Sequence, residues 1–332
     1  MAIGPYDALL VVSFGGPEGP DDVLPFLSQV TKGRGVPPER LAEVARQYDR
    51  FGGVSPINGQ VRALVAALED PAAGLDGLPV RWGNRNSRPW LVDAVAGLAG
   101  EGFGRVAAFV TSAFPGYSSC RQYREDIATA RAAVGPRAPV IDKLLPYGNH
   151  AGFVEAVVAR VAGPWAASMP GAVLIFTAHS IPTAAAAGSD YEAAIRESCA
   201  LVADGVGATG WELAFQSRSG AERVPWLGPD VGERIEALAA GGVPEVVVVP
   251  IGFTSDHMEI VYDLDTLAAG RAARAGIRFT RAATVGTHPA FVSMVGDLVR
   301  EAAGLVPTVR LGARGAQAVC GQPACCVPPR RP

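Results

Sequence analysis

Eight short apolar runs, rich in valine, isoleucine and leucine, alternate with stretches in which apolar residues recur at helical spacing. Parallel strands need a long crossover connection, and its helix covers a face of the sheet, so this alternation is typical of βαβ units. The sequence therefore predicts an α/β fold with parallel sheets. The expected strands are residues 9–14, 80–83, 106–111, 140–141, 173–178, 211–215, 246–251 and 277–283.

An internal repeat divides these strands into two groups of four. Residues 150–157 resemble residues 288–295, and residues 110–114 resemble residues 249–253 at nearly the same offset. A repeat on this scale indicates two structural units of similar fold. We expect domains over 1–150 and 151–288, followed by a C-terminal helix and cysteine-bearing tail over 289–332.

Composition narrows the classes of function. The chain has 332 residues, of which 49% are apolar and 18% charged, and a formal net charge of -3. Its lysines and arginines are spread out, which argues against a nucleic-acid partner. No apolar stretch approaches the roughly 20 residues that span a bilayer. We expect a cytoplasmic monomer that is not embedded in a membrane.

One apolar strand leads directly to a histidine. Residues 173–178 run into His179, and Ser-Ile-Pro follows at 180–182. The carboxyl ends of parallel strands face the ligand crevice in open α/β sheets, so His179 is a candidate for chemistry. A histidine that only bonds the backbone at a strand end is the structural alternative.

A set of carboxylates follows the seventh strand. Asp256, Glu259 and Asp263 are spaced by three and four residues, and His257 adjoins them. We expect Ser255 to cap a helix whose first turn holds Asp256 and whose one face carries all three carboxylates. Such a row is often an ordinary solvated face. Next to a strand end it can instead carry cations or protons into a cleft.

Nucleotide-binding loops are missing from the sequence. The turn after the first strand reads Gly-Gly-Pro-Glu-Gly at 15–19, which does not fit Gly-x-Gly-x-x-Gly. There is also no Gly-x4-Gly-Lys-Ser/Thr segment. A nucleotide cofactor is therefore not expected.

The cysteines are few and unevenly placed. Three of the five, Cys320, Cys325 and Cys326, lie within the last thirteen residues. In a cytosolic chain an odd number of cysteines gathered in this way favours metal or cluster ligation over disulfides. A fourth ligand would have to come from elsewhere in the chain.

Five motifs in order make the chain resemble ferrochelatases, in particular the cluster-bearing actinobacterial branch of that family. They are Phe-Gly-Gly-Pro-Glu at 14–18, Phe-Gly-Gly-Val-Ser-Pro-Ile-Asn at 51–58, Thr-Ala-His-Ser-Ile-Pro at 177–182, Gln-Ser-Arg at 216–218 with Pro-Trp-Leu-Gly-Pro at 225–229, and Phe-Thr-Ser-Asp-His-Met-Glu at 253–259. The resemblance implies two Rossmann-like domains, each a four-stranded parallel sheet flanked by helices, which enclose a porphyrin cleft.

The resemblance also implies roles for single residues. His179 matches the family's catalytic histidine and Glu259 the acidic residue across the cleft, so both are expected to meet the Fe²⁺ that is inserted. Metal insertion releases two pyrrole protons, so it requires a base. It also requires that the cleft walls bend the macrocycle. Many relatives carry a tyrosine where this chain has Phe14, which offers no oxygen to a metal.

By the same resemblance, a [2Fe-2S] cluster is expected on four cysteines. Cys120 matches the upstream ligand, and Cys320, Cys325 and Cys326 supply the other thiolates. A four-cysteine zinc site is the alternative. Cys199, within a helical stretch, is expected to be a buried core residue.

The segment 28–38 favours coproporphyrin III as the porphyrin. It is polar and basic, without the apolar lip that docks on lipid, and a basic mouth suits four ionised propionates. Relatives place an arginine where this chain has Gln47, so Arg46 or Arg50 would replace it. The alternatives are a protoporphyrin IX ferrochelatase, a sirohydrochlorin-type cobalt or nickel chelatase, and a tetrapyrrole-binding protein without catalysis. The candidate substrate-binding residues are Phe14, Lys32, Arg34, Arg46, Tyr48, Ser55 and Tyr123.

Overall fold

Two parallel four-stranded sheets form the framework of the chain. The structure is a computed structural model, and it describes residues 3–33, 35–219, 223–314 and 326. The first sheet has the order β2-β1-β3-β4 and the second β6-β5-β7-β8, with every pairing parallel. All eight predicted strands are confirmed. Their bounds are β1 Ala8–Ser13, β2 Val80–Asn84, β3 Arg105–Val110, β4 Val140–Lys143, β5 Val173–His179, β6 Trp211–Gln216, β7 Glu245–Val249 and β8 Arg278–Arg281.

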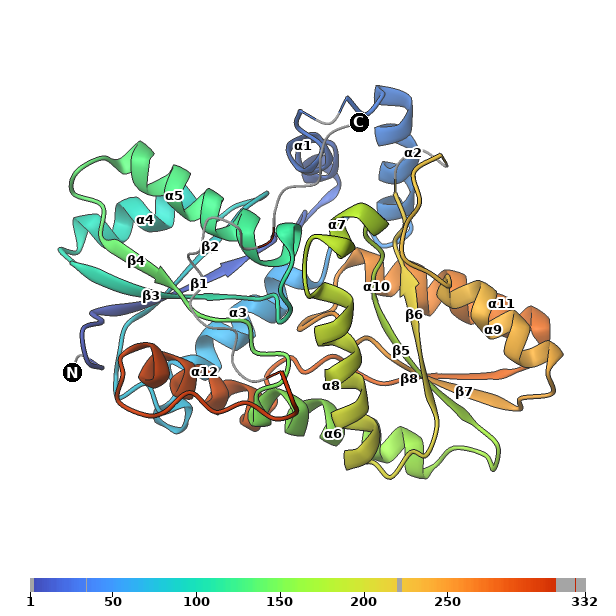
Figure 1. Cartoon of the computed structure of the whole chain (residues 1–332). Coiled ribbons are helices and arrows are strands. Elements are labelled where there is room, and N and C mark those ends of the chain that lie inside the picture. Colours follow the sequence, from blue (N-terminus) through green and yellow to red (C-terminus); the bar gives the residue numbers. More distant parts are fainter. Residues whose placement is uncertain (1–2, 34, 220–222, 315–325, 327–332) are drawn as a thin grey trace.

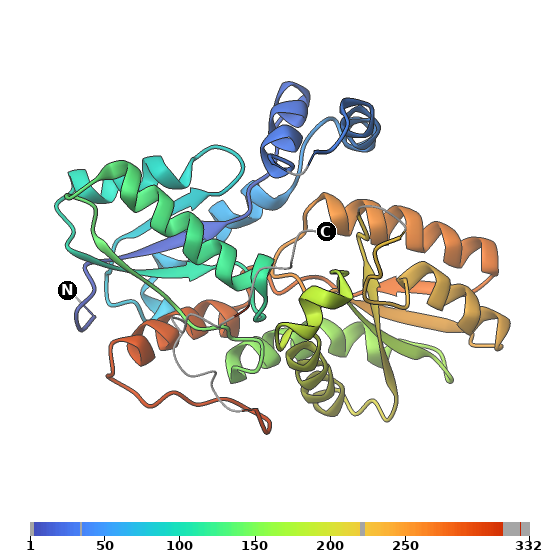
Figure 2. The same ribbon diagram turned by 45° about the horizontal axis from the view of Figure 1, so that its top comes forward.

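Helices cover both sheets, which lie side by side in Figures 1 and 2. In both views α1 and α2 project together from the body of the molecule. Two π-helical turns, Tyr117–Arg121 and Asp263–Ala268, interrupt the helical segments. The helices are α1 Pro20–Val30, α2 Pro38–Asp49, α3 Ile57–Leu68, α4 Leu91–Gly100, α5 Gln122–Val134, α6 Ala151–Ala166, α7 Thr183–Ala187, α8 Tyr191–Gly205, α9 Val231–Ala240, α10 Met258–Tyr262, α11 Ala269–Ala275 and α12 Pro289–Ala302.

The central strands are apolar on both faces because helices lie on both sides of each sheet. In β1 the five residues Ala8 to Val12 have no exposed surface. Their side chains alternate between two clusters, with Leu9 and Val11 in one and Leu10 and Val12 in the other. Complete burial of a valine or leucine side chain stabilises the fold by about 1.5–3 kcal/mol. The continuous apolar run in the sequence reflects this two-sided burial.

The repeat seen in the sequence corresponds to two sheets of identical strand order. The repeated segments form α6 and α12, which pack against each other. Each begins with a capping histidine: His150 Nδ1 accepts from Gly152 N at 3.1 Å, and His288 Nδ1 accepts from Ala290 N at 3.3 Å. The Phe153 and Phe291 rings meet with centroids 6.4 Å apart. One apolar cluster therefore runs through both halves, while the domain boundaries at residues 150 and 288 stay predictions.

Candidate active site

His179 and Glu259 lie at the carboxyl ends of neighbouring strands. His179 is the last residue of β5, and Glu259 stands in the first turn of α10, which follows the adjacent strand β7. The His179 Nε2 atom is 3.5 Å from Glu259 Oε1. Both side chains reach solvent, with 32% and 45% of their surface exposed. The structure thus brings together the two residues that the sequence singled out for chemistry, but on one sheet and not on facing walls as expected, because β5 and β7 are neighbouring strands.

The two side chains form an ion pair. Burial lowers the pKa of His179, but the negative charge of Glu259, a hydrogen bond with it, the Ser180 carbonyl and Asp263 outweigh burial and raise the pKa to about 9. Burial raises the pKa of Glu259, but the charge of His179, their hydrogen bond and His257 lower it to about 2. Near neutral pH the pair is therefore imidazolium and carboxylate.

Backbone contacts fix the orientation of the His179 ring. The Nδ1 atom lies 2.5 Å from the Ser180 carbonyl oxygen, which can only accept, so Nδ1 carries a hydrogen. A deprotonated ring then has its free lone pair on Nε2, the atom nearest Glu259. The Tyr191 hydroxyl donates to the His179 carbonyl oxygen at 3.0 Å. Any proton that this ring gains or loses would therefore move at Nε2.

His257 caps α10, which the sequence placed at Ser255. Its Nδ1 accepts from Glu259 N at 3.2 Å, and its ring meets Phe253 edge-on at 4.9 Å between centroids. The helix begins at Met258, two residues later than expected, because the turn after β7 extends to His257. Burial lowers the pKa of His257, so the ring is neutral near pH 7.

Asp256 does not belong to the carboxylate row, which corrects the expectation from spacing. Its carboxylate accepts from Arg281 Nη1 at 3.1 Å and from Thr284 Oγ1 at 3.3 Å. Its backbone N–H donates to Gln60 Oε1 at 2.8 Å. Since Asp256 precedes α10, it does not share the helical face of Glu259, and a β8 arginine neutralises it.

Asp263 remains beside Glu259 at the other end of α10. The Ser217 hydroxyl donates to its Oδ2 at 2.5 Å, and Gln216 Nε2 donates to the Glu259 carbonyl oxygen at 2.9 Å. Burial raises the pKa of Asp263; the Ser217 hydrogen bond opposes the rise and the charge of Glu259 adds to it, which brings the pKa to about 7. Asp263 can therefore exchange a proton near neutral pH.

Phe14 lies in the first half, immediately after β1. The residue is 36% exposed, and its ring meets Phe26 of α1 edge-on at 6.1 Å between centroids. Phe26 in turn contacts Tyr48 of α2, and Met258 beside Glu259 belongs to the same apolar cluster. This cluster joins α1 and α2 to the Glu259 side of the site.

Arg85 is a charged residue that the sequence reasoning missed. It follows β2, and its side chain is 6% exposed and paired with Asp126. The guanidinium carbon lies 4.3 Å from the centroid of the Tyr123 ring and 5.9 Å from that of Phe14. The available signal was its position: like His179, it stands at the carboxyl end of a strand.

The other candidate substrate residues fall into three environments. Tyr48, Ser55 and Tyr123 are buried, with 9%, 4% and 4% exposure. Lys32 lines a cavity of about 550 Å³ between α1 and the 86–90 loop, together with Phe26 and Arg88. Arg46 is exposed on α2, while Arg34 lies outside the described residues. The structure does not place these side chains in one cluster.

Of the five cysteines, three belong to the described residues and all three are buried. Cys120 is buried in the π-helical turn after β3, and Cys326 is also buried. Cys199 is fully buried in α8, as expected of a core residue. Cys320 and Cys325 lie outside the described residues. Within the part of the chain that the structure describes, no three histidine, cysteine or acidic side chains form a group that could hold a metal.

Comparison with solved structures defines the fold class. A structure described as SirB from Bacillus subtilis with Fe³⁺ has a TM-score of 0.54 and 14% identity, over 89% of this chain and 95% of that chain. At this identity the likeness concerns the fold alone, and that fold is the one of the chelatases.

Sequence comparison then gives the family. The family model described as Ferrochelatase matches residues 6–303. A ferrochelatase of Rhodopirellula baltica is 49% identical over 99% of this chain and 95% of its own length. Coproporphyrin III ferrochelatases of Streptomyces coelicolor and Frankia alni are 50% and 51% identical over 99% of this chain, and 95% and 88% of their own lengths. The chain belongs to the ferrochelatase family and is a metal chelatase enzyme.

None of the described helices is long and apolar enough to cross a bilayer.

Proposed function

We propose that this enzyme inserts Fe²⁺ into coproporphyrin III to give coproheme, with His179 and Glu259 as the catalytic residues. The observation that carries the proposal is the 3.5 Å separation of His179 Nε2 and Glu259 Oε1 at adjoining strand ends. The chain that carries this pair is about half identical to coproporphyrin III ferrochelatases over 95% and 88% of their lengths. The porphyrin would lie between the two halves, with Phe14 on one wall and His179 on the other.

The ion pair suggests how metal and protons exchange. Each turnover replaces two pyrrole protons by one Fe²⁺. The dication would bind between Glu259 and Nε2 and displace the proton of the imidazolium, because metal and proton compete for the same lone pairs. Once Fe²⁺ passes to the pyrrole nitrogens, Nε2 is free to accept a pyrrole proton.

Asp263 offers a route for the second proton. Its pKa of about 7 lets it take up and release protons at neutral pH, and the charge of Glu259 acts on it directly. The Ser217 hydroxyl keeps the carboxyl oriented. We assign Asp263 to proton transfer between Glu259 and solvent.

Coproporphyrin III is the substrate favoured by the charges on the first half. Lys32 and Arg46 carry positive charge on and near α1 and α2, and Arg34 lies between them in sequence. With Tyr48, Ser55 and Tyr123 these residues are our candidates for propionate contacts, which charge-assisted hydrogen bonds would strengthen. Phe14 would contact the macrocycle itself.

A direct comparison of porphyrins tests the substrate. Initial rates with Fe²⁺ are measured anaerobically, without detergent, for coproporphyrin III and protoporphyrin IX. We expect a higher kcat/KM for coproporphyrin III, and a preference for protoporphyrin IX would overturn the assignment. Turnover of sirohydrochlorin with Co²⁺ or Ni²⁺ alone would indicate the second chelatase type, and stoichiometric binding without metallation would indicate a carrier.

We also propose a [2Fe-2S] cluster on Cys120, Cys320, Cys325 and Cys326. Two of these four thiols, Cys120 and Cys326, belong to the described residues, and both are buried, which suits a shielded cluster. When bound, such a cluster supplies one-electron chemistry or structural cross-linking.

Spectroscopy of the purified protein tests the cluster. Anaerobically purified protein is expected to absorb visible light and contain iron and sulfide, and Cys120→Ser should lose both. Colourless protein with stoichiometric zinc would identify the four-cysteine zinc site instead. Sedimentation and cell fractionation would test the cytoplasmic monomer that we also propose.

A further inference from the structure

The segment 305–314, here called the C-terminal strap, runs from α12 to the loop before α6 and to α8. A buried ion pair anchors it: Arg310 Nη1 lies 2.8 Å from Glu301 Oε1, and their side chains are 1% and 7% exposed. A second bond joins Arg310 Nη2 and Glu301 Oε2 at 2.9 Å. The strap is therefore fixed to α12 before it reaches α8.

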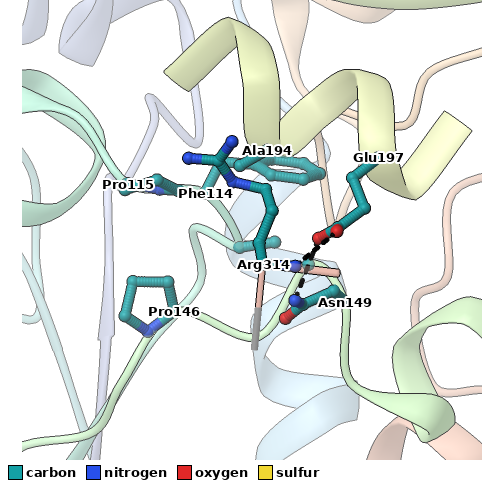
Figure 3. A pocket seen from close by; sticks show the side chains of 9 residues that line it. Phe114, Pro115, Pro146, Asn149, Ala194, Glu197 and Arg314 are labelled. Atoms are coloured by element: carbon teal, nitrogen blue, oxygen red, sulfur yellow. Dashed lines mark hydrogen bonds between the residues drawn. The ribbon is translucent and has the colours of Figure 1, made fainter. Parts of the chain in front are cut away.

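Asn149 and Glu197 hold the end of the strap. Leu311 N donates to the Asn149 carbonyl oxygen at 2.9 Å, and Asn149 Nδ2 donates to Glu197 Oε2 at 3.1 Å. Arg314 N donates to Glu197 Oε1 at 2.9 Å. Figure 3 shows Glu197 reaching from α8 toward the strap and Asn149. One carboxylate on α8 thus ties the strap to the loop before α6.

Gly312 allows this close approach. Its φ is +76°, a region that favours glycine, and a Cβ at this position would lie 2.5 Å from Glu197 Oε1. A side chain here would strain the backbone and displace the Glu197 carboxylate that holds the strap.

Arg314 then reaches the beginning of α8. Its Nη2 lies 2.9 Å from Asp190 Oδ1, and Asp190 immediately precedes the helix. In Figure 3 its side chain extends past Phe114 and Pro115, residues of the first half. The strap therefore meets both halves where α8 begins.

The first residue of α8 connects this contact to the active site. Tyr191 is 6% exposed, and its hydroxyl donates to the His179 carbonyl oxygen at 3.0 Å. A Cβ on Gly116, at the end of the loop after β3, would lie 3.5 Å from its ring. With its ring enclosed and its hydroxyl bonded, Tyr191 transmits a displacement of the α8 terminus to the backbone of His179.

We propose that Arg314 is a positioning residue for His179, which acts through Asp190 and Tyr191. The proposal rests on the function proposed above, since it assumes that His179 works on the substrate. Arg314 contacts neither the His179 side chain nor Glu259. It instead affects the position of the His179 imidazole at the end of β5.

The Arg314–Asp190 pair is suited to positioning more than to stabilising the fold. Its side chains are 33% and 55% exposed, so solvent screens their attraction and the pair adds little to global stability. Arg310, Asn149 and Glu197 keep the rest of the strap in place. Arg314→Ala should therefore fold normally, while the α8 terminus loses its outer contact.

Full-length variants test the link by separating kcat from KM. We expect Arg314→Ala and Asp190→Ala each to lower kcat by about 2- to 5-fold, as a solvent-exposed pair allows, with KM changed less than about twofold. The double variant should lose no more than Asp190→Ala alone, because both substitutions break the Arg314–Asp190 contact. Arg314→Glu combined with Asp190→Arg should recover kcat. Arg137→Ala, at an exposed arginine in the turn before β4, is the matched control.

Hydrogen exchange gives a readout that does not depend on turnover. In Arg314→Ala the amides of residues 179–195 should exchange faster than in the control, and Tyr191→Phe should show the same pattern. Exchange and kcat equal to those of Arg137→Ala would overturn the proposal. If His179 were dispensable for metallation, the proposed mechanism would fail. The exchange data would still test whether Arg314 is coupled to the His179 backbone.

Discussion

Replacing Glu259 by glutamine should reverse the protonation state of His179 at neutral pH. In the native protein burial and Glu259 act on the imidazole in opposite directions, and the carboxylate prevails to give a pKa of about 9. Without that charge, burial is opposed by the Ser180 carbonyl and Asp263 alone among the groups that raised the pKa, so the pKa should fall from about 9 toward its ordinary value of 6.5. At about pH 7.5 the protonated fraction would drop from about 97% toward about 10%.

The assay is an NMR titration of the imidazole Cε1–H signals. The chain has four histidines, so His179→Gln identifies the relevant signal by its disappearance. Glu155→Gln, at an exposed position on α6, serves as the control and should leave the His179 midpoint unchanged. A midpoint that stays near 9 in Glu259→Gln would refute the reasoning, because the carboxylate would then not be the group that holds the proton.

The same pair predicts a pH window for stability. The lowered pKa of Glu259 adds stability above about pH 4.5 that is lost as the pH falls toward 2. The raised pKa of His179 adds stability below about pH 6.5 that is lost as the pH rises toward 9. The pair should therefore contribute most between these values. Solvent exposure of both side chains reduces the size of the contribution.

Three further outcomes follow from the structure. His179→Ala should lower kcat by about 10² to 10⁴ with little change in Tm, and near-native turnover would exclude it as the base. Asp263→Asn should raise Tm at about pH 8 and less at about pH 5. The native carboxyl is buried at both pH values, but with its pKa of about 7 it carries a charge only at the higher one, where its burial is unfavourable; equal shifts at both pH values would contradict this. Leu10→Ala, in the middle of β1, should lower the free energy of unfolding by about 2–5 kcal/mol in denaturant titrations, and a loss under about 1 kcal/mol would contradict the two-sided burial.

Local patterns were sufficient to predict the strands and to place His179 at a strand end. The runs around β1 and β5 are apolar on both faces, as a covered parallel sheet requires. The pairing with Glu259 came from the family resemblance, which set it across the cleft, whereas the fold puts both residues at neighbouring strand ends of one sheet. Asp256 could not be assigned in this way. Its partner Arg281 lies on β8, and only the folded chain shows that an arginine there neutralises it.

Backbone geometry accounts for the remaining differences. Helical spacing assumes a regular helix, whereas the turn to His257 and the π-helical segment Asp263–Ala268 shift the register on either side of Glu259. Arg85 was missed because an arginine near a strand end looks like an ordinary surface charge. Its burial against Tyr123 depends on the placement of α5, which no local pattern specifies.

The contact between α6 and α12 limits how the molecule can move. Because the Phe153 and Phe291 rings interlock and one apolar cluster extends through both halves, rotating one half against the other would break a continuous core. Hinge opening between the halves would therefore disrupt the packing that holds both sheets. The α1–α2 pair projects away from this core, so a movement of these two helices would leave the geometry between the sheets unchanged.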